Sequence, residues 1–377
     1  MHNKKVLISF LGNIDYDTRC YNLYNSLEAK GYEVNFIGFD WLTENFNSVK
    51  GKKTIIKLSK KLSSIIFYFK FFSILKFQLL FRKYDTLFAE DLYTLPLCVI
   101  VGKIKGAKVI YDCRELFGFL AGLKDKPLVQ KLWQLVEKIF IKKADLVLVT
   151  GEMDADFLKA HYHIQNIIVL RNLPLFNKAK NPVNFYEKLN IARDKKILIY
   201  QGVVVKGRGI DMIFKLLSLT EDFILILLGD GEHIDYYKNQ STMLGISEKV
   251  YFVGKIPQDE LINYTAGAFI GLSLIENVSL SYYYALPNKL FEYIMAEIPV
   301  ITTDLPQMKK IVDDYNVGFT IKENDIEQLR LILNDVKNDE QLYVNLKSNC
   351  VSASKILNWD NEFKNLENFI STQILQH

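Results

Sequence analysis

Hydrophobic runs of strand length alternate with amphipathic stretches of helix length along almost the whole chain. The runs are apolar nearly without interruption, which is typical of strands buried on both faces of a parallel sheet. The amphipathic stretches between them predict βαβ units and a doubly wound α/β fold. The predicted strands are residues 5–10, 32–39, 84–90, 107–113, 144–150 and 166–170, followed by 196–202, 223–229, 249–254, 268–275, 298–304 and 317–321.

These strands form two series, separated by a polar segment at residues 171–196 that contains two prolines and has no strand signal. A chain of 377 residues also fits two domains of about 150–200 residues better than one core. We therefore expect two Rossmann-like domains, at 1–172 and 195–357, with a linker at 173–194. Residues 358–377 predict a last helix, with apolar positions at Phe363, Leu366, Phe369, Ile370 and Ile374.

Composition and charge narrow the class of protein. The chain is 49% hydrophobic and 24% charged, which is typical of a globular protein. Residues 1–180 carry 28 Lys and Arg against 17 Asp and Glu, a net charge of +11, whereas residues 181–377 carry −7. A basic half favours phosphates or an anionic membrane surface as partners. The four cysteines have no C-x-x-C spacing and the N-terminus resembles a strand rather than a signal peptide, so we expect reduced thiols in a cytoplasmic protein.

The segment "ALPNKLFEYIMAEIPVITTD", residues 285–304, arranges charge at the start of a predicted helix. Asn288 is the predicted N-cap, and Lys289 lies in the first turn, where free backbone N–H groups already favour an anion. Glu292 lies on the same face and suits the two hydroxyls of a ribose. The segment is equally consistent with an ordinary capped helix that carries a Lys–Glu pair.

Two loops after predicted strands of the second series are rich in glycine. The segment "YQGVVVKGRGID" at 200–211 combines three glycines with two cations that could clamp a phosphate, and "LLGDGE" at 227–232 adds two more glycines. Neither segment is a P-loop or a G-x-G-x-x-G fingerprint, so each is weak by itself. The residues are Gly202, Lys206, Gly207, Arg208 and Gly209, followed by Gly229 and Gly231.

The order of these motifs, with "VYFVGKIPQDEL" and "IPVITTDLPQMKKIVDDYNVGFTI", resembles the donor domain of GT-B glycosyltransferases of the family 4 kind. In the first half, "DTRCYNLYNSLEAKGYEV", "AEDLYTLP", "IYDCRELF" and "VEKIFIKKADLVLVT" are similar to the acceptor domain of that family. The resemblance covers about 350 residues of the 377. It implies two Rossmann-like, doubly wound parallel-sheet domains that face a central cleft, with the last helix crossing back to the first domain.

The resemblance also implies a nucleotide-sugar donor held by the second domain. Arg208 and Lys206 would neutralise its diphosphate, together with Lys289 at the helix start. Glu292 would hold the ribose, and the backbone of residues 254–256 would meet the base. No metal and no cofactor is expected, because basic side chains and a helix dipole stabilise the leaving group. The predicted donor-binding residues are Gly202, Lys206, Arg208, Gly229, Gly231, Lys255, Glu276, Asn288, Lys289, Leu290 and Glu292.

The chain departs from the family pattern at three places. Lys206 and Arg208 lie closer together than the usual Arg and Lys of the diphosphate clamp, so Lys289 is a candidate for its second member. Tyr284 stands where relatives often carry a Glu, and Glu276 is the nearest upstream substitute. Arg114 stands where many relatives carry a His. The predicted catalytic residues, which would face acceptor and sugar, are Glu115, Arg114, Asp91 and Gly12. Glu115 could equally be a helix cap. The resemblance implies retention of configuration, by a front-face substitution in which the leaving diphosphate helps to take the acceptor proton.

Residues 50–84 form a basic stretch, with ten Lys and Arg and no Asp or Glu. It is rich in Phe and Ile, but no run is long enough to span a membrane. Three interpretations stay open: a buried helix with a solvated lysine edge, a helix that contacts an anionic membrane, and a site for a protein partner. Nucleic acid is not expected, because no recognition motif accompanies the charge.

The leading hypothesis is a metal-independent bacterial glycosyltransferase, cytoplasmic or peripheral on the inner face of the membrane. It would move a sugar from a UDP- or GDP-sugar to a glycan or a polyprenyl-diphosphate-linked acceptor, in cell-surface polysaccharide or glycolipid biosynthesis. One alternative is a nucleotide-sugar 2-epimerase of the same shape, which the scarcity of His disfavours. Another is a catalytically silent scaffold that binds nucleotide or lipid, which Tyr284 and Arg114 keep open.

Overall fold

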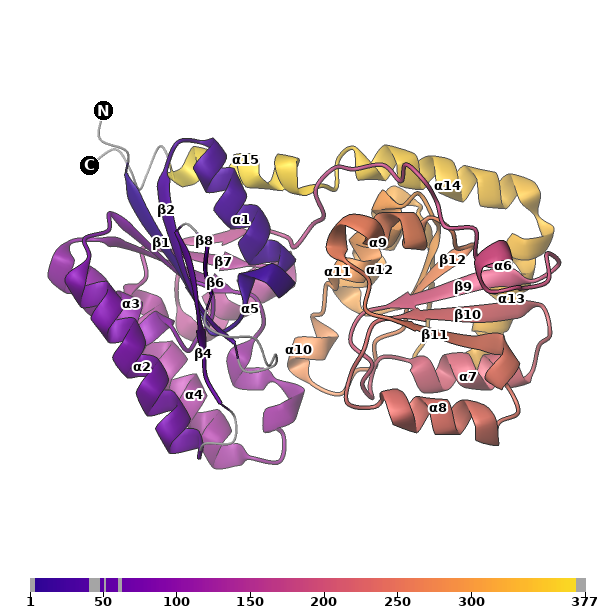
Figure 1. The fold of residues 1–377 in the computed structure, drawn as a ribbon, viewed down its shortest axis with the longest axis horizontal. Coiled ribbons are helices and arrows are strands. Elements are labelled where there is room, and N and C mark those ends of the chain that lie inside the picture. Colours follow the sequence, from indigo (N-terminus) through magenta and orange to yellow (C-terminus); the bar gives the residue numbers. More distant parts are fainter. Residues whose placement is uncertain (1–3, 41–47, 51, 60–62, 371–377) are drawn as a thin grey trace. The chain divides into compact units, whose positions relative to one another are not determined.

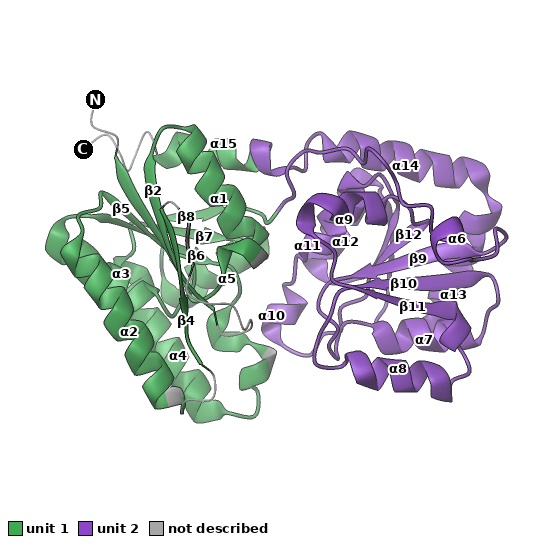
Figure 2. Cartoon of the chain, viewed as in Figure 1, with its two compact units in different colours: residues 1–172, 362–377 green, residues 173–361 purple. Residues whose placement is uncertain are grey.

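The chain divides into two compact units, which Figure 2 shows in different colours. The first unit comprises residues 1–172 and 362–377, and the second comprises residues 173–361. The computed structural model describes residues 4–40, 48–50, 52–59 and 63–370. Each unit is a parallel sheet with helices on both faces, so the predicted α/β class is confirmed.

The first unit contains an eight-stranded sheet with the order β3-β4-β2-β1-β5-β6-β7-β8. Neighbouring strands pair in parallel, except that β3 is antiparallel to β4. The strand order reverses between β1 and β5, and ligands of such sheets bind beyond the carboxyl ends of the strands at this point. The strands are β1 (Lys5–Phe10), β2 (Glu33–Asp40), β3 (Ser48–Lys50), β4 (Lys53–Lys57), β5 (Thr86–Ala89), β6 (Lys108–Cys113), β7 (Leu146–Val149) and β8 (Ile167–Val169).

The helices of the first unit cover both faces of this sheet. Figure 1 shows α2, α3 and α4 together on one face and α1 with α15 on the other. On the first face, the ring of Phe71 packs edge-on against Phe39 of β2, with their centroids 4.7 Å apart. The helices are α1 (Thr18–Ala29), α2 (Ser64–Phe81), α3 (Leu95–Lys105), α4 (Pro127–Phe140), α5 (Glu152–Tyr162) and α15 (Trp359–Phe369).

The second unit contains a six-stranded parallel sheet with the order β11-β10-β9-β12-β13-β14. Its order reverses between β9 and β12, so the loops after these two strands flank the expected ligand-binding edge. The strands are β9 (Lys196–Gln201), β10 (Phe223–Leu228), β11 (Val250–Gly254), β12 (Ile270–Ser273), β13 (Val300–Thr303) and β14 (Gly318–Ile321).

Two buried hydrophobic clusters lie on the two faces of this second sheet. Side chains of α7 and α13 belong to one cluster, and side chains of α11 and α12 to the other. A sheet buried on both faces explains why its strands are nearly free of polar residues. The helices are α6 (Phe185–Lys188), α7 (Ile210–Ser218), α8 (Ile234–Met243), α9 (Gln258–Thr265), α10 (Leu280–Tyr283), α11 (Asn288–Met295), α12 (Pro306–Tyr315), α13 (Ile326–Asn338) and α14 (Glu340–Ser354).

The hydrophobic pattern located the strands well. Every predicted strand is present, with bounds within two residues of the prediction. β3 and β4 were not predicted, and both lie at or within the basic stretch, whose later part forms α2. The residues predicted as a linker, 173–194, lie within the second unit: Leu173 and Phe185 are buried in its core, and the Val183 amide donates to the Asn263 carbonyl.

The last helix, α15, passes from the second unit into the first. The Trp359 amide donates to the Pro174 carbonyl at 2.8 Å, which holds the start of the helix within the second unit. Within the first unit, Glu362 accepts hydrogen bonds from the side chain and the amide of Arg171. Glu367 pairs with Lys30 of α1 at 2.7 Å. Ile374 lies outside the described residues.

Candidate active site

Glycine loops pack closely against each other at the carboxyl edge of the second sheet. The Gly202 amide donates to the Leu228 carbonyl at 2.9 Å, and the Gly229 amide donates to the Gly254 carbonyl at 2.8 Å. Gly202 and Gly229 have φ of 126° and 133°, which L side chains rarely adopt. A Cβ on Gly229 would lie 1.9 Å from the Gly202 carbonyl oxygen. Likewise, a Cβ on Gly231 would lie 2.3 Å from the Val204 carbonyl oxygen. These glycines let three loops converge on one edge.

Lys289, in the first turn of α11, is buried beside this edge. Its side chain is 8% exposed, and its Nζ lies 3.7 Å from the ring centroid of Tyr200, in cation–π contact. A Cβ on Gly202 would lie only 3.4 Å from that Nζ. Among the residues that the structure describes, no carboxylate lies within 4.0 Å of the Lys289 ammonium. The first turn of α11 therefore holds a buried cation that no ion pair neutralises.

Arg208 is a second cation at the same edge. It lies between Gly207 and Gly209, which have φ of 80° and 75°, and its guanidinium lies 4.6 Å from the ring centroid of Tyr282. Burial lowers the pKa of Lys289 well below its usual value, and repulsion from Arg208 lowers it further, against the attraction of Glu292. Two cations that repel each other at a helix start form an arrangement that an anion stabilises.

Glu292, one turn further along α11, is held by a chain of polar side chains. Gln201, the last residue of β9, donates through Nε2 to Glu292 Oε2. The Thr265 hydroxyl lies 2.8 Å from Gln201 Oε1, and both Thr265 and Gln201 are buried. Burial raises the pKa of Glu292, while the hydrogen bonds from Gln201 and Gln258 and the charge of Lys289 oppose that rise. The carboxylate is thus fixed in direction beside the two cations.

Five residues of this arrangement were missed in the sequence: Tyr200, Gln201, Gln258, Thr265 and Tyr282. Tyr200 and Gln201 end a buried strand at its carboxyl edge, so their position was a usable signal. A glutamine inside an otherwise apolar run is also unusual, because a buried amide needs hydrogen-bond partners. Thr265 and Tyr282 belong to α9 and α10, and nothing in their local sequence indicates a contact with the site.

The helix start differs in detail from the prediction. Pro287, not Asn288, is the N-cap of α11: its backbone is extended, with φ −75° and ψ 143°, and its carbonyl accepts from the Leu290 amide at 3.1 Å. The prediction of Asn288 as the N-cap was therefore wrong, because proline fixes φ and ends the preceding extended segment. Asn288 is the first helical residue. The Leu290 side chain lies in the hydrophobic core.

Three other predicted donor residues have local partners. Lys206 is exposed, and its Nζ lies 4.7 Å from the Tyr236 ring centroid. Lys255 is exposed and lies 3.7 Å from Asp230. The Glu276 amide donates to the Gly207 carbonyl at 3.1 Å, and burial raises the pKa of its carboxyl against a hydrogen bond from the Gly209 backbone. Glu276 thus supports the turn that carries Arg208, rather than joining Lys289 and Glu292.

In the first unit, Arg114 lies in a buried network of ion pairs at the carboxyl edge of β6. Its NH1 donates to Asp17 at 2.6 Å and its NH2 donates to Glu90 at 2.7 Å. Its guanidinium also lies 4.6 Å from the ring centroid of Phe10. The side chain that the sequence predicted to face the sugar is therefore matched by protein carboxylates. Asp112, the third carboxylate of this network, makes a two-point pair with Arg19 and lies 3.9 Å from Arg114.

Glu90 is a carboxylate of this network whose charged form is disfavoured by its burial. Burial and the charge of Asp112 raise the pKa of Glu90 to about 7, against the attraction of Arg114 and Arg19. Its Oε1 has no hydrogen-bond partner among the described residues. Sequence reasoning missed Asp17, Arg19, Glu90 and Asp112, which come from three separate segments: the start of α1, the end of β5 and β6.

The other three predicted catalytic residues differ in their exposure and in their contacts. Asp91 is buried and accepts hydrogen bonds from the Leu11 and Thr94 amides at 2.6 and 2.7 Å, so it ties the loop after β1 to the loop after β5. Burial raises the pKa of Asp91 to about 6, although these hydrogen bonds lower it. A Cβ on Gly12 would lie 2.2 Å from the Phe10 ring, so Gly12 makes room for the ring that contacts Arg114. Glu115 is exposed directly after β6.

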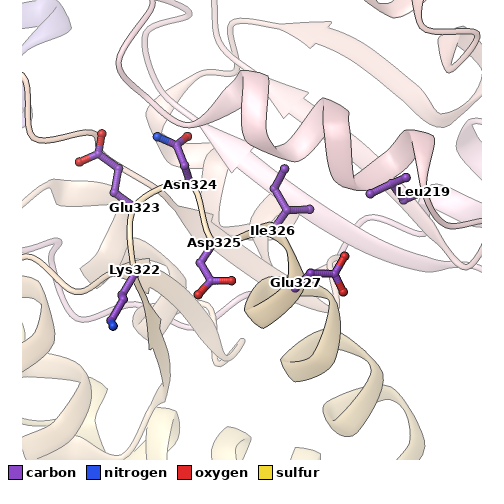
Figure 3. Close-up of a pocket in the computed structure, with 7 residues that line it drawn as sticks. All are labelled: Leu219, Lys322, Glu323, Asn324, Asp325, Ile326 and Glu327. Atoms are coloured by element: carbon purple, nitrogen blue, oxygen red, sulfur yellow. The ribbon is translucent and has the colours of Figure 1, made fainter.

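A surface depression of about 520 Å³ lies apart from these residues (Figure 3). Its lining is Leu219 with residues 322–327, and it includes none of the predicted site residues. Three carboxylates, Glu323, Asp325 and Glu327, line it beside the single cation Lys322. An acidic depression does not suit a phosphate ligand. The glycine loops with Lys289, Arg208 and Glu292 are therefore the better candidate site.

The two doubly wound sheets, with a cationic helix start at the carboxyl edge of the second, define a GT-B type glycosyltransferase. Family models match the two halves separately: "Glycosyltransferase Family 4" matches residues 17–173 and "Glycosyl transferases group 1" matches residues 184–351. Both halves of the chain therefore match glycosyltransferase families, and the two matches together extend from residue 17 to residue 351.

Similar proteins agree with this assignment. An uncharacterized glycosyltransferase of Haemophilus influenzae is 21% identical over 345 residues, covering 86% of this chain and 87% of its own length. Sucrose-phosphate synthase from Thermosynechococcus elongatus has a TM-score of 0.81 at 16% identity, covering 98% of both chains. Anabaena HepE in complex with UDP-glucose has a TM-score of 0.74 at 14% identity, covering 98% of this chain and 100% of its own.

Proposed function

We propose that the second unit binds a nucleoside-diphosphate sugar at the carboxyl edge of its sheet. The observation that carries this proposal is the pair of cations Lys289 and Arg208, which repel each other. Lys289 is buried and has no carboxylate partner within the described residues. A diphosphate would neutralise both, and the first turn of α11 would add its free N–H groups and dipole. UDP is the first nucleotide to test, because HepE was solved with UDP-glucose.

Glu292 suits the ribose of the same ligand. The side-chain amide of Gln201, which is itself held by the Thr265 hydroxyl, fixes the orientation of the Glu292 carboxylate. The carboxylate can then accept hydrogen bonds from two vicinal hydroxyls. Such charge-assisted bonds are stronger than neutral ones. Lys289 and Glu292 lie about one turn apart on α11, a spacing that suits the diphosphate and the ribose of one ligand.

The proposed reaction transfers the sugar to a hydroxyl of a glycan or a lipid-linked acceptor. The bond between the sugar C1 and the diphosphate oxygen breaks, and a bond between C1 and the acceptor oxygen forms on the same face of the ring. The acceptor proton goes to the departing diphosphate. Arg208 and Lys289 would stabilise the charge that develops on the leaving group, without a metal ion. The chain itself supplies no nucleophile in this scheme.

Calorimetric titration with UDP, GDP, CDP and ADP, each with and without EDTA, tests the donor site. One nucleotide should bind, with the same affinity in EDTA. Glu292→Gln should weaken UDP about 10- to 100-fold, because charge-assisted hydrogen bonds to the ribose are lost. The same substitution should leave 2′,3′-dideoxy-UDP unchanged, since that analogue has no ribose hydroxyls. An equal loss for both ligands would show that Glu292 does not read the ribose.

Turnover separates a transferase from a silent nucleotide-binding scaffold. Radiolabelled donor sugar should be released or transferred in the presence of membrane extract, and Glu292→Gln should slow this. Tight nucleotide binding without any turnover would favour the scaffold.

A further inference from the structure

Helix α4 packs on the first unit with its polar side. Gln130 and Gln134 each donate through Nε2 to the Gly118 carbonyl at 3.0 Å. Glu137 is fully buried, and its carboxylate accepts hydrogen bonds from the Tyr111 and Tyr162 hydroxyls, both at 2.8 Å. Positions 130, 134 and 137 lie on one helix face, so this face is polar and turned inward.

The opposite face of α4 is apolar and exposed. Leu128, Leu132, Leu135 and Ile139 recur at helical spacing and are 43% to 82% exposed. A surface helix ordinarily buries such a stripe and exposes its polar face. α4 does the reverse: the partly buried Gln130 and Gln134 donate to the Gly118 carbonyl, and the buried Glu137 carboxylate accepts from two tyrosine hydroxyls. Scattered exposed leucines are common, but an aligned stripe of four indicates an interaction surface.

Helix α2 extends this apolar surface. Its inner face buries Phe67, Phe71, Leu75 and Leu79. Its outer face exposes further large apolar side chains, each 60% to 83% exposed: Ile65, Phe69, Phe77 and Phe81. Figure 1 shows α2 beside α4, and the two helices meet where the rings of Tyr68 and Trp133 lie 6.0 Å apart.

The charge on these helices has one sign. Every exposed charged side chain of α2, α3 and α4 is a lysine, because the sole carboxylate in the three helices is the buried Glu137. These lysines are Lys70, Lys76, Lys103, Lys131 and Lys138. We define the outer surface of α2 and α4 with these lysines as the α2–α4 face.

We propose that the α2–α4 face binds the surface of an anionic lipid bilayer. Apolar side chains would enter the boundary between headgroups and acyl chains, and the lysines would pair with lipid phosphates and carboxylates. Among the described helices, none has the length and hydrophobicity to span a bilayer, so this binding is peripheral. A symmetric dimer through the same face would oppose lysines to lysines without a carboxylate between them.

Of the three interpretations of the basic stretch, the proposal selects contact with an anionic membrane. The residues that form this surface differ from the basic stretch itself. Residues 53–57 form β4 rather than part of a membrane helix, and α4, which lies outside the stretch, supplies the aligned leucines. The lysine edge is solvated, but the apolar residues between the lysines are exposed as well. The apolar part of the binding surface therefore comes from two segments, α2 and α4, that are about 60 residues apart in the sequence.

Vesicle flotation of the full chain tests the proposal. The protein should float with vesicles of phosphatidylcholine and phosphatidylglycerol at 7:3, but not with phosphatidylcholine alone, and high salt should weaken the binding. The double variant Leu132→Gln/Leu135→Gln should lose at least tenfold in partitioning. The matched control Leu331→Gln/Val344→Gln, which changes exposed apolar residues of α13 and α14 in the second unit, should bind as the parent does.

Three results would overturn the proposal. The first is absence of the parent protein from anionic vesicles, and the second is equal vesicle binding by the α4 variant. The third is a dimer in light scattering that Leu132→Gln/Leu135→Gln abolishes, because that would make the face a contact between copies. Nucleotide titration of the α4 variant keeps the two proposals separate, since the donor site should bind UDP normally whether or not the bilayer is bound.

Discussion

Replacing Lys289 by methionine should weaken donor binding and stabilise the protein at the same time. The substitution keeps the length of the side chain and removes only its charge. Lys289 is 8% exposed, and its ammonium lies against the Tyr200 ring without a carboxylate partner among the described residues. A methionine can keep the contact with that ring, because its sulfur packs well against aromatic side chains. Weaker donor binding together with higher stability distinguishes a cation that binds ligand from a cation that stabilises the fold.

The magnitudes follow from the surroundings of the ammonium. A charge-assisted hydrogen bond contributes about 1.5–3 kcal/mol, so UDP affinity should fall about 10- to 150-fold. Removal of a buried cation without a partner should add ~1–3 kcal/mol to the free energy of unfolding. That gain corresponds to a rise in Tm of about 2–4 °C per kcal/mol for a domain of this size.

The dependence of this gain on pH has a definite sign. The folded protein lowers the pKa of Lys289, whereas the unfolded chain restores it to about 10.4. Between these two values the unfolded state binds more protons, so the stability of the parent protein rises with pH. The stabilisation by Lys289→Met should therefore be largest below the folded pKa of Lys289 and disappear as the pH approaches about 10.

Calorimetric UDP titration and chemical denaturation of the same preparations measure both effects. Lys309→Met is the matched control, because Lys309 is half exposed on α12 and pairs with Asp313 at 2.8 Å. The control should change the free energy of unfolding by less than about 1 kcal/mol and leave UDP affinity unaltered. A Lys289→Met protein that is less stable than the parent and still binds UDP normally would refute the reasoning.

Two further predictions concern stability. Gly229→Ala should lower the free energy of unfolding by about 2–4 kcal/mol, since a Cβ there would lie 1.9 Å from the Gly202 carbonyl oxygen at a φ of 133°. Gly245 is the matched control, because its φ is 67° but the space around it is open. Gly245→Ala should lower the free energy of unfolding by only about 1 kcal/mol in the same denaturation assay. Glu90 has its pKa raised to about 7, so its contribution to stability is full below the unfolded pKa of about 4.3 and is lost as the pH rises through 7. Glu90→Gln should flatten this decline between pH 5 and 8, and an unchanged slope would exclude Glu90 as its source.

The fold was largely predictable because its strands are buried on both faces. Burial on both faces produces uninterrupted apolar runs, and their alternation with helices determines a parallel sheet. β3 and β4 escaped because they are short and lie among lysines. The helical pattern of α4 was visible in the sequence, but periodicity does not say which face turns inward. That choice depends on Tyr111 and Tyr162, which bind Glu137 from β6 and α5.

In the candidate site, too, local sequence signals were readable, whereas contacts between distant segments were not. Lys289, Arg208 and Glu292 were found because a helix start and a glycine loop after a strand are local signals. Arg114 met the same local criteria, since it follows the carboxyl end of β6. It differs from Lys289 only in its neighbours, because Asp17, Glu90 and Asp112 neutralise it. Asp17 and Glu90 come from other segments of the chain, whereas Asp112 lies on β6 itself.

This contrast gives a physical criterion for which cations bind ligand. The two arginines of the buried network in the first unit, Arg19 and Arg114, each have carboxylate partners. Their charge is therefore satisfied without a ligand, and their removal would leave buried carboxylates unpaired. Lys289 has no such partner within the described residues, and its pKa falls because the folded protein disfavours its charge. A buried cation that the protein destabilises needs a reason outside the protein, and a bound anion at the start of α11 provides one.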